Sequence, residues 1–293
     1  MVRALFAMLF WAASFVFVKI VYQYLGPIST IFIRLIISGS LLMLFYALNK
    51  NREKIYKKDF LLLFLLGFTE PFLYFIGEGF GMKYITATHA SVIVATIPIF
   101  AMISSALLYK EKVSVINKLG VIVSFLGIIL MIGIKGLLAP GSAIGFALMF
   151  FAVFAAVSNS LLIFKLGNRY SSLTIITVQN VVGALLFLPL FFIFEPKGFS
   201  FTTFNFELIG SIIFLSIFPS VISFVLFISV LKEIGITKAS AFTNLIPVLT
   251  GIISFILLGT RFSIIEILGI GFVIVGLFLS QKRNYEEIIP YKG

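Results

Sequence analysis

Cysteine is absent from the 293 residues, and histidine occurs once, at His89. The first absence excludes disulfide bonds, thiol catalysis and cysteine-based metal sites. A single histidine excludes a multi-histidine metal centre, so we expect no cofactor and no metal. Charged residues make up only 11% of the chain, against about 25% in an average soluble domain. With 61% hydrophobic residues, the composition excludes a soluble enzyme, a disordered chain and a single-anchor protein.

Ten apolar stretches recur along the chain, and each has about the 20 residues that a membrane-spanning helix needs. Strands of a membrane barrel would be about half as long, so the lengths predict an all-α polytopic membrane protein. The first stretch also resembles a signal peptide, but the internal repeat described below requires it as a helix. The predicted stretches are residues 3–22, 28–48, 60–80, 85–109, 115–134, 143–166, 173–194, 208–231, 239–259 and 264–280.

Basic residues are distributed unevenly between the loops. With the N-terminus placed inside, sixteen Lys and Arg residues fall on the cytoplasmic side and four fall outside. Because cytoplasmic loops accumulate Lys and Arg, both termini are predicted to be cytoplasmic, in a plasma (inner) membrane. The loop at residues 49–59 is then cytoplasmic and that at 195–207 external. The net charge of +11 has the same origin, and no nucleic-acid partner is expected.

An internal repeat divides the ten stretches into two sets of five. Pro98 and Pro247 are 149 residues apart, and the same offset aligns several of their neighbours. Because each set has an odd number of helices, the second enters the membrane from the opposite side, which makes the repeat inverted. The predicted units are residues 1–136 and 142–282, followed by a cytoplasmic tail at 283–293.

Four prolines occupy matching places in the two units: Pro71, Pro98, Pro219 and Pro247. Each is predicted near the middle of a helix, where it removes a backbone hydrogen bond and frees carbonyls to face a cavity or to flex. Inverted repeats can exchange conformations, so that a cavity opens first to one side and then to the other. We therefore predict hinges at the prolines; the alternative is ordinary packing, because proline is common in membrane helices.

Glycines recur every seven residues in the last stretch of each unit, at Gly120 and Gly127 and at Gly269 and Gly276. Small residues on one face allow close helix contact. We predict that these helices pack against the rest of the bundle, with a dimer contact as the alternative. The expected state is a monomer or a weak dimer.

Several short motifs are those of a known family of membrane proteins. They are Trp11-Ala12-Ala13-Ser14-Phe15, Lys19, Arg34, Pro98, Tyr109-Lys110-Glu111-Lys112, Gly120, Gly127, Pro247, Gly269 and Gly276. With them the chain resembles the ten-helix, EamA-type branch of the drug/metabolite transporter superfamily. Thr260-Arg261 stands where that family usually has Gly-Glu. The resemblance implies export or exchange of small metabolites, amino acids or drugs, through a cavity lined by helices 1–4 and 6–9.

Glu70 is predicted about nine residues, or ~14 Å, below the outer end of the third helix. An unpaired carboxylate at that depth is costly and usually faces a cavity or a partner. We predict that Glu70 contacts a substrate amine or carries a proton; the alternative is a buried structural pair with Arg34 or Lys19. Tyr74 and Glu78 follow at helical spacing and extend the polar stripe.

Lys19, Glu78 and His89 are predicted near outer helix ends, where snorkelling or a gate-like ion pair is expected, and Arg34 joins this gate group. For His89 the alternative is a structural residue at a helix start. Trp11 lies in the middle of its helix and is predicted to stack on a substrate or to pack. Uncharged amides predicted to orient a ligand or to bond between helices are Asn159, Gln179, Asn180 and Asn244.

Three functions are compatible with these patterns. The first is a secondary transporter of a small molecule in the lipid bilayer, with proton coupling as an option. A channel would need rings of like charge or filter loops. A membrane-embedded enzyme would need clustered acids, bases or metal ligands, so we expect no enzyme. Within transport, the rival cargo is anionic, such as a phosphate or a sugar nucleotide bound by Arg34 and Lys19.

Overall fold

The computed structural model describes residues 2–50, 53–109, 114–137, 140–167, 169–195, 205–234, 239 and 241–280. Within these ranges every regular element is helical, which confirms the all-α prediction. Seven helical segments are long and apolar enough to cross a membrane, and three shorter apolar helices accompany them. The predicted tail at 283–293 lies outside the described residues.

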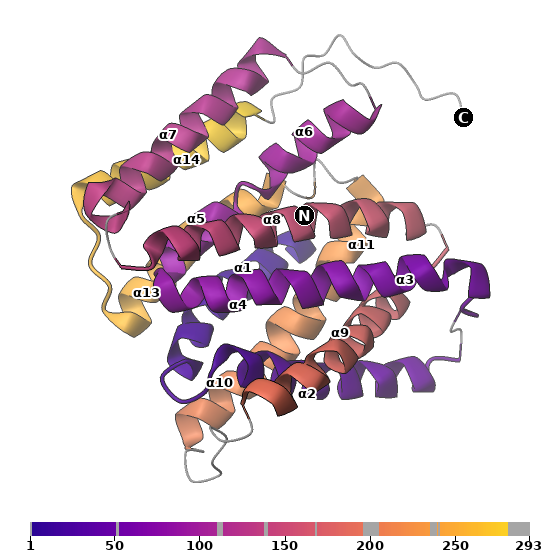
Figure 1. The fold of residues 1–293 in the computed structure, drawn as a ribbon. Coiled ribbons are helices and arrows are strands. Elements are labelled where there is room, and N and C mark those ends of the chain that lie inside the picture. Colours follow the sequence, from indigo (N-terminus) through magenta and orange to yellow (C-terminus); the bar gives the residue numbers. More distant parts are fainter. Residues whose placement is uncertain are drawn as a thin grey trace.

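Helices follow one another along the described parts of the chain (Figure 1). The first half contains α1 (Val2–Val21), α2 (Pro27–Leu48), η1 (Lys57–Asp59), α3 (Phe60–Gly67), η2 (Phe68–Leu73), α4 (Tyr74–Tyr84), α5 (Ala87–Val94), α6 (Ile97–Tyr109) and α7 (Val115–Leu137). The second half contains α8 (Ser142–Leu166), α9 (Ser172–Phe194), α10 (Phe206–Ile217), η4 (Phe218–Ser223), α11 (Phe224–Ile234), η5 (Ala241–Leu245), α13 (Ile246–Leu258) and α14 (Ile264–Ser280).

Two of the predicted hinge prolines lie in π-helical segments in the middle of long helices. Pro71 is in η2, which joins α3 to α4, and Pro219 is in η4, which joins α10 to α11. Proline lacks the N–H that a regular helix needs, and such wide turns are frequent at functional sites. A hydroxyl group in each segment donates to a carbonyl of the preceding helix, from Thr69 to Leu65 and from Ser220 to Leu215.

The other two prolines begin helices, which corrects the prediction that they lie within them. The helix α5 ends at Val94, and α6 starts at Ile97 with Pro98 as its second residue. In the same way, η5 leads into α13, whose second residue is Pro247. The first N–H groups of a helix have no intrahelical acceptor, so proline costs no hydrogen bond there. The first helix is therefore interrupted between Val94 and Ile97, while the second changes from the 3₁₀ turn η5 to the α-helix α13 one residue before Pro247.

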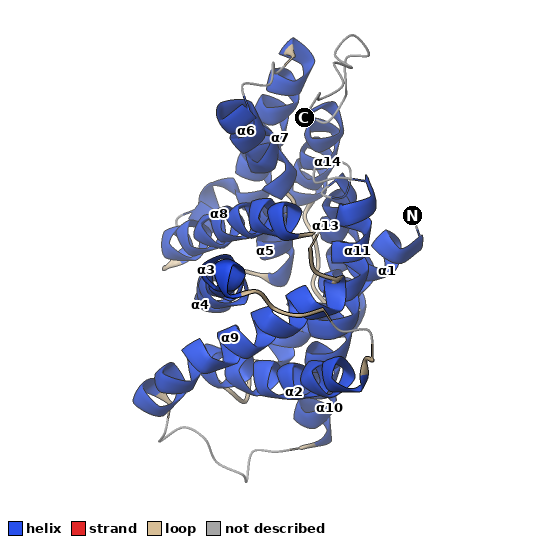
Figure 2. Cartoon of the chain, turned by 90° about the vertical axis from the view of Figure 1, so that its right-hand side faces the viewer, coloured by secondary structure: helices blue, strands red, loops and turns tan. Residues whose placement is uncertain are grey.

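The repeated glycines of α7 and α14 pack against one another. The prediction that they pack against the rest of the bundle is therefore wrong. A side chain added at Gly120 would collide with the backbone at Gly276, and one added at Gly127 would collide with the backbone at Gly269. The two helices lie side by side in Figure 1, on the opposite side of the molecule from α2, α9 and α10 in Figure 2.

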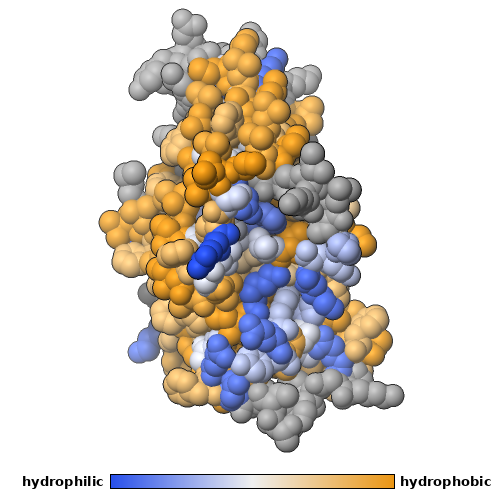
Figure 3. Space-filling view, turned by 90° about the vertical axis from the view of Figure 1, so that its left-hand side faces the viewer, coloured by the Kyte–Doolittle hydropathy of each residue, from blue (hydrophilic) through white to orange (hydrophobic). Residues whose placement is uncertain are grey.

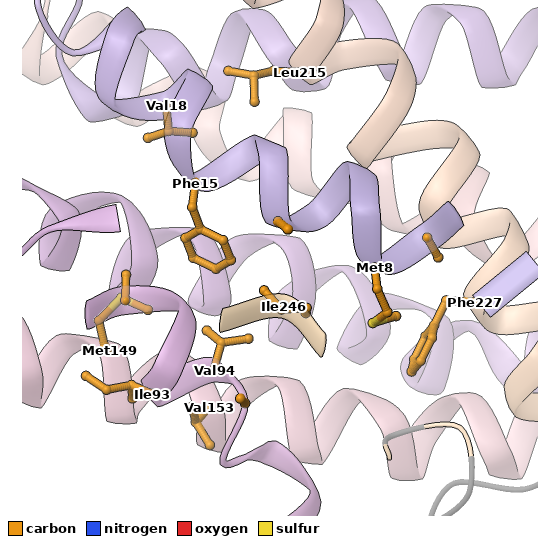
Figure 4. Close-up of a cluster of buried hydrophobic side chains, with 14 of the residues drawn as sticks. Met8, Phe15, Val18, Ile93, Val94, Met149, Val153, Leu215, Phe227 and Ile246 are labelled. Carbon is orange, nitrogen blue, oxygen red and sulfur yellow. The ribbon is translucent and has the colours of Figure 1, made fainter. Parts of the chain in front are cut away.

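The buried apolar core is built by both halves of the chain. Figure 4 shows Met8 and Phe15 of α1 close to Ile246 of α13 and Phe227 of α11. On the outside, apolar residues cover the upper part of the face drawn in Figure 3, while hydrophilic residues gather in its central and lower part. Such large exposed apolar areas are expected where a protein contacts lipid.

Candidate functional site

A cavity with about 750 Å³ of empty space lies inside the bundle. Side chains from α1, α2, η2, α4, α5, α6, α8, α11, η5 and α13 line it, so both halves contribute to its wall. A smaller cavity of about 220 Å³ shares part of this wall and is also lined by α9. The residues predicted as functional that line the larger cavity are Trp11, Arg34, Glu70, Tyr74, Glu78 and Asn159.

Glu70 is held in the wall by amide groups of the second half. Its backbone is extended, with φ −146° and ψ 121°, inside the π-helical segment η2. Asn159 Nδ2 donates to Glu70 Oε2 at 2.7 Å, and Gln179 Nε2 donates to the Glu70 carbonyl at 3.0 Å. Gln179 Nε2 also donates to Asn159 Oδ1 at 3.0 Å. Both amides, predicted as substrate contacts, therefore bond to Glu70 or to each other.

Arg34 lines the same cavity and is 4% exposed. Its Nε donates to Ser220 Oγ, and its guanidinium carbon lies 4.6 Å from the ring centroid of Phe75. Among the described residues Arg34 forms no ion pair, so the alternative pairing with Glu70 is not present. Its terminal guanidinium nitrogens have no hydrogen-bond partner within those ranges.

Glu78 is a second carboxylate of the cavity wall, which corrects the expectation that it reaches water at a helix end. It is 8% exposed and accepts a 3.0 Å hydrogen bond from the Tyr74 hydroxyl at Oε1. One turn of helix separates these two residues, so the polar stripe predicted on this helix is present. The cavity thus contains two carboxylates and one guanidinium that are not paired with one another in the described residues.

The remaining wall is aromatic and apolar. The Trp11 ring lies 5.1 Å from that of Phe224 and 4.9 Å from that of Phe227, centroid to centroid. Its indole N–H donates to the carbonyl of Pro219 at 3.2 Å. Trp11 therefore packs against α11 and also lines the cavity, so both alternatives predicted for it are compatible with its position. Phe15 and Ile246 also line the cavity, and Figure 4 shows them beside each other.

Three predicted residues lie away from both cavities. Lys19 Nζ donates to the Met82 carbonyl, and no carboxylate of the described chain pairs with it, so the predicted gate pair is absent. His89 lies in the first turn of α5, with its ring 6.0 Å from that of Phe146. The side-chain atoms of Asn244 are buried and have no hydrogen-bond partner among the described residues.

Asn180 lines the smaller cavity but is already bonded between helices. Its Oδ1 accepts a 2.6 Å hydrogen bond from the Ser38 hydroxyl of α2, and its Nδ2 donates to the Ile176 carbonyl. The bond between Ser38 and Asn180 is an interhelical bond of the kind that small polar side chains make in membrane bundles.

The second helix of each half reaches the π-helical segment of the other half. From α2, Arg34 bonds to Ser220 in η4; from α9, Gln179 bonds to the backbone of Glu70 in η2. In the predicted repeat, Arg34 pairs with Gln179 at an offset of 145 residues, four fewer than the offset between Pro98 and Pro247, so the two residues hold matching places in the predicted units.

Two glutamates at the ends of this helix pair were missed by the sequence reasoning. Glu53 accepts from the Ser171 amide at 3.0 Å and from the Thr174 hydroxyl at 2.6 Å, at the start of α9. Glu195 accepts from the amide of Ser29 at 3.1 Å, at the start of α2. Each carboxylate satisfies free N–H groups at a helix N-terminus. The partners are distant in sequence, so local capping patterns could not reveal them.

Burial acts to raise the pKa of the Glu53 carboxyl, but hydrogen bonds from Thr174 and Ser171 act in the opposite direction. The hydrogen bonds prevail, and the pKa lies below its ordinary value of 4.5.

An all-helical bundle with apolar flanks and a buried, charged cavity defines the class of polytopic membrane transporters. The sequence profile of the EamA-like transporter family matches the chain twice, over residues 1–133 and 143–281. The chain belongs to the EamA-like transporter family, which confirms the resemblance found in its motifs.

Relatives of similar length support this assignment. An uncharacterized transporter of Archaeoglobus fulgidus is 28% identical over 277 residues, covering 94% of this chain and 96% of its own length. The uncharacterized transporter YetK of Bacillus subtilis is 28% identical over 261 residues, covering 87% and 78%. A solved crystal structure has the same fold, with a TM-score of 0.72 at 14% identity over 95% of this chain and 96% of the other.

Proposed function

We propose that this transporter exports or exchanges small metabolites, amino acids or drugs by alternating access through the central cavity. The observation that carries the proposal is the cavity wall itself, which combines unpaired charges of both signs with aromatic rings. Buried charges inside a membrane bundle usually mark a substrate or ion pathway.

The charge pattern favours a cargo that carries an amine and a carboxylate, with an apolar body. Glu70 and Glu78 offer carboxylate oxygens to an ammonium group. The two terminal nitrogens of Arg34 can bind a carboxylate with a pair of parallel hydrogen bonds. The rings of Trp11 and Phe227 would contact the apolar body. The rival anionic cargo is less well supported, because Lys19 is bonded elsewhere and does not line the cavity.

The path of alternating access is proposed to run between two inverted five-helix units, with ten spans and both termini cytoplasmic. Support comes from the paired contacts of Arg34 and Gln179 and from the matching π-helical segments η2 and η4. Irregular backbone at membrane depth is tolerated where it lines a cavity, and such segments allow neighbouring half-helices to tilt. A protonatable Glu70 is the proposed coupling group.

Counterflow in proteoliposomes tests the proposal. Vesicles loaded with an unlabelled amino acid or amine should take up the same compound, supplied outside in labelled form at trace concentration. Vesicles loaded with a phosphate ester should not accumulate the labelled ester. A chemically changed product would indicate an enzyme, and unsaturable flux without counterflow would indicate a channel. Accumulation driven only by phosphate esters would overturn the cargo assignment and support the anionic alternative.

The orientation has its own test, made simple by a chain without cysteine. Single cysteines at Asn51 and Thr203 can be labelled in intact cells with an impermeant thiol reagent. Labelling of Thr203→Cys alone is expected from the distribution of Lys and Arg. Labelling of Asn51→Cys alone would reverse the proposed topology.

A further inference from the structure

A basic segment, residues 50–59, connects α2 to α3. It carries four exposed lysines: Lys50, Lys54, Lys57 and Lys58. None of them forms an ion pair with a carboxylate in the part of the chain that the structure describes. The segment also contains two acidic residues, Glu53 and Asp59, which would normally reduce its positive potential.

Both acidic side chains are engaged by the protein itself. Asp59 is 2% exposed and accepts a 2.7 Å hydrogen bond from Arg169 Nη1 and a 2.9 Å bond from the Tyr170 hydroxyl. Glu53 is bonded to the start of α9, as described above. The two carboxylates are therefore bonded within the protein while the four lysines are exposed, so the described part of the segment presents positive charge at its surface.

The same surface adjoins apolar side chains that would face lipid. Leu48 at the end of α2 is 69% exposed, and Leu61 at the start of α3 is 68% exposed. Tyr56 lies between them in sequence, half exposed, with the Lys58 ammonium 5.6 Å from its ring centroid. Aromatic rings and lysines placed just beyond apolar helix ends are typical of the headgroup level of a bilayer.

We infer that Lys50, Lys54, Lys57 and Lys58 bind the phosphate groups of anionic phospholipids. The exposed apolar residues on both flanks decide for a lipid over an acidic protein segment, because a lipid supplies a phosphate and acyl chains together. Each lysine close to an anionic membrane surface contributes a factor of about five in binding at low salt. The interaction does not depend on the cargo or on the direction of transport.

Fluorescence transfer in vesicles measures this preference at the segment itself. A donor dye on Asn51→Cys reports on nearby acceptor-labelled phosphatidylglycerol, compared with acceptor-labelled phosphatidylcholine in otherwise identical vesicles. The expected result is stronger transfer to phosphatidylglycerol, which decreases when salt is raised. In the variant Lys54→Gln/Lys57→Gln/Lys58→Gln, the preference for phosphatidylglycerol over phosphatidylcholine should fall at least fivefold. The matched control, Lys83→Gln/Lys118→Gln/Lys165→Gln, removes the same charge elsewhere and should keep it.

Several results would overturn the inference. One is equal transfer to both lipids in the unsubstituted chain, which needs no lysine variant and so does not depend on its folding. Another is an equal loss of preference in the two triple variants, which would reduce the effect to net charge. Displacement of the lipid by millimolar inorganic phosphate would show a site for free phosphate, and displacement by an acidic peptide would show a protein-binding surface.

Discussion

Replacing Gln179 by methionine separates a residue that positions Glu70 from one that binds cargo. Methionine keeps the length of the side chain but removes the amide. The two hydrogen bonds lost are those to the Glu70 carbonyl and to Asn159 Oδ1, both 3.0 Å long. Asn159 is buried and Glu70 half-buried, so both acceptors lose a donor inside the bundle. We expect Gln179→Met to reduce stability and to impair transport through Glu70.

The size of the effect follows from the setting. A buried acceptor left unpaired costs about 1–3 kcal/mol in a soluble protein, but interhelical hydrogen bonds in membranes average about 0.6 kcal/mol and reach about 1.7. The membrane value applies here, because the unfolded helices in a bilayer or micelle also find partners. Two bonds therefore predict a loss of about 1–2 kcal/mol. The maximal rate should fall by a larger factor than KM rises, because the amide acts only through Glu70 and does not itself hold the cargo.

Unfolding with sodium dodecyl sulfate in mixed micelles measures the free energy, and proteoliposome counterflow measures KM and maximal rate. Gln23→Met, in an exposed loop, is the matched control and should stay within ~0.5 kcal/mol of the unsubstituted protein. Unchanged stability of Gln179→Met together with a large rise in KM would refute the positioning role and restore the substrate contact predicted from the sequence.

Two further predictions concern the helix pair and the prolines. Glu53→Gln should lower stability by about 1 kcal/mol or less at neutral pH, because the carboxylate is partly exposed. The pKa of Glu53 is depressed in the folded state, so its contribution is present above pH 4.5 and is lost as the pH falls through the folded-state pKa. The difference in stability from the unsubstituted protein should therefore vanish in acid, and a difference independent of pH would contradict this. Pro98→Ala and Pro247→Ala should slow counterflow more than they reduce folded yield, because alanine allows α6 and α13 to extend back toward α5 and through η5. Equal loss of yield and rate would support packing alone.

The helices could be predicted well from the sequence because the bilayer imposes one simple requirement. Each apolar stretch must satisfy its backbone internally over about 20 residues, so length and composition locate it. The predicted stretch 28–48 and the observed α2, Pro27–Leu48, differ by one residue. The starts of α6 and α13 just before Pro98 and Pro247 could not be predicted, because proline is compatible both with a kink inside a helix and with the start of one.

The site was predicted in part. Depth in the helix predicted that Glu70 faces a cavity or a partner, and the cavity wall contains it. Glu78 was misplaced because its distance from the helix end suggested water, whereas Tyr74 and the neighbouring helices bury it. The long-range caps made by Glu53 and Glu195 depend on how α2 and α9 pair, which a local pattern does not contain.

Glu70→Gln tests the central claim most directly. The amide keeps the shape and can still bond to Asn159, but it cannot lose or gain a proton or balance an ammonium charge. Counterflow is measured in proteoliposomes across a range of pH, with Glu266→Gln as a control, since Glu266 bonds to Ser263 at the start of α14 and lines neither cavity. We predict that Glu70→Gln reaches the membrane in normal amount but loses transport or its pH dependence, while Glu266→Gln transports normally. Transport by Glu70→Gln at the unsubstituted rate, with an unchanged pH profile, would contradict the account.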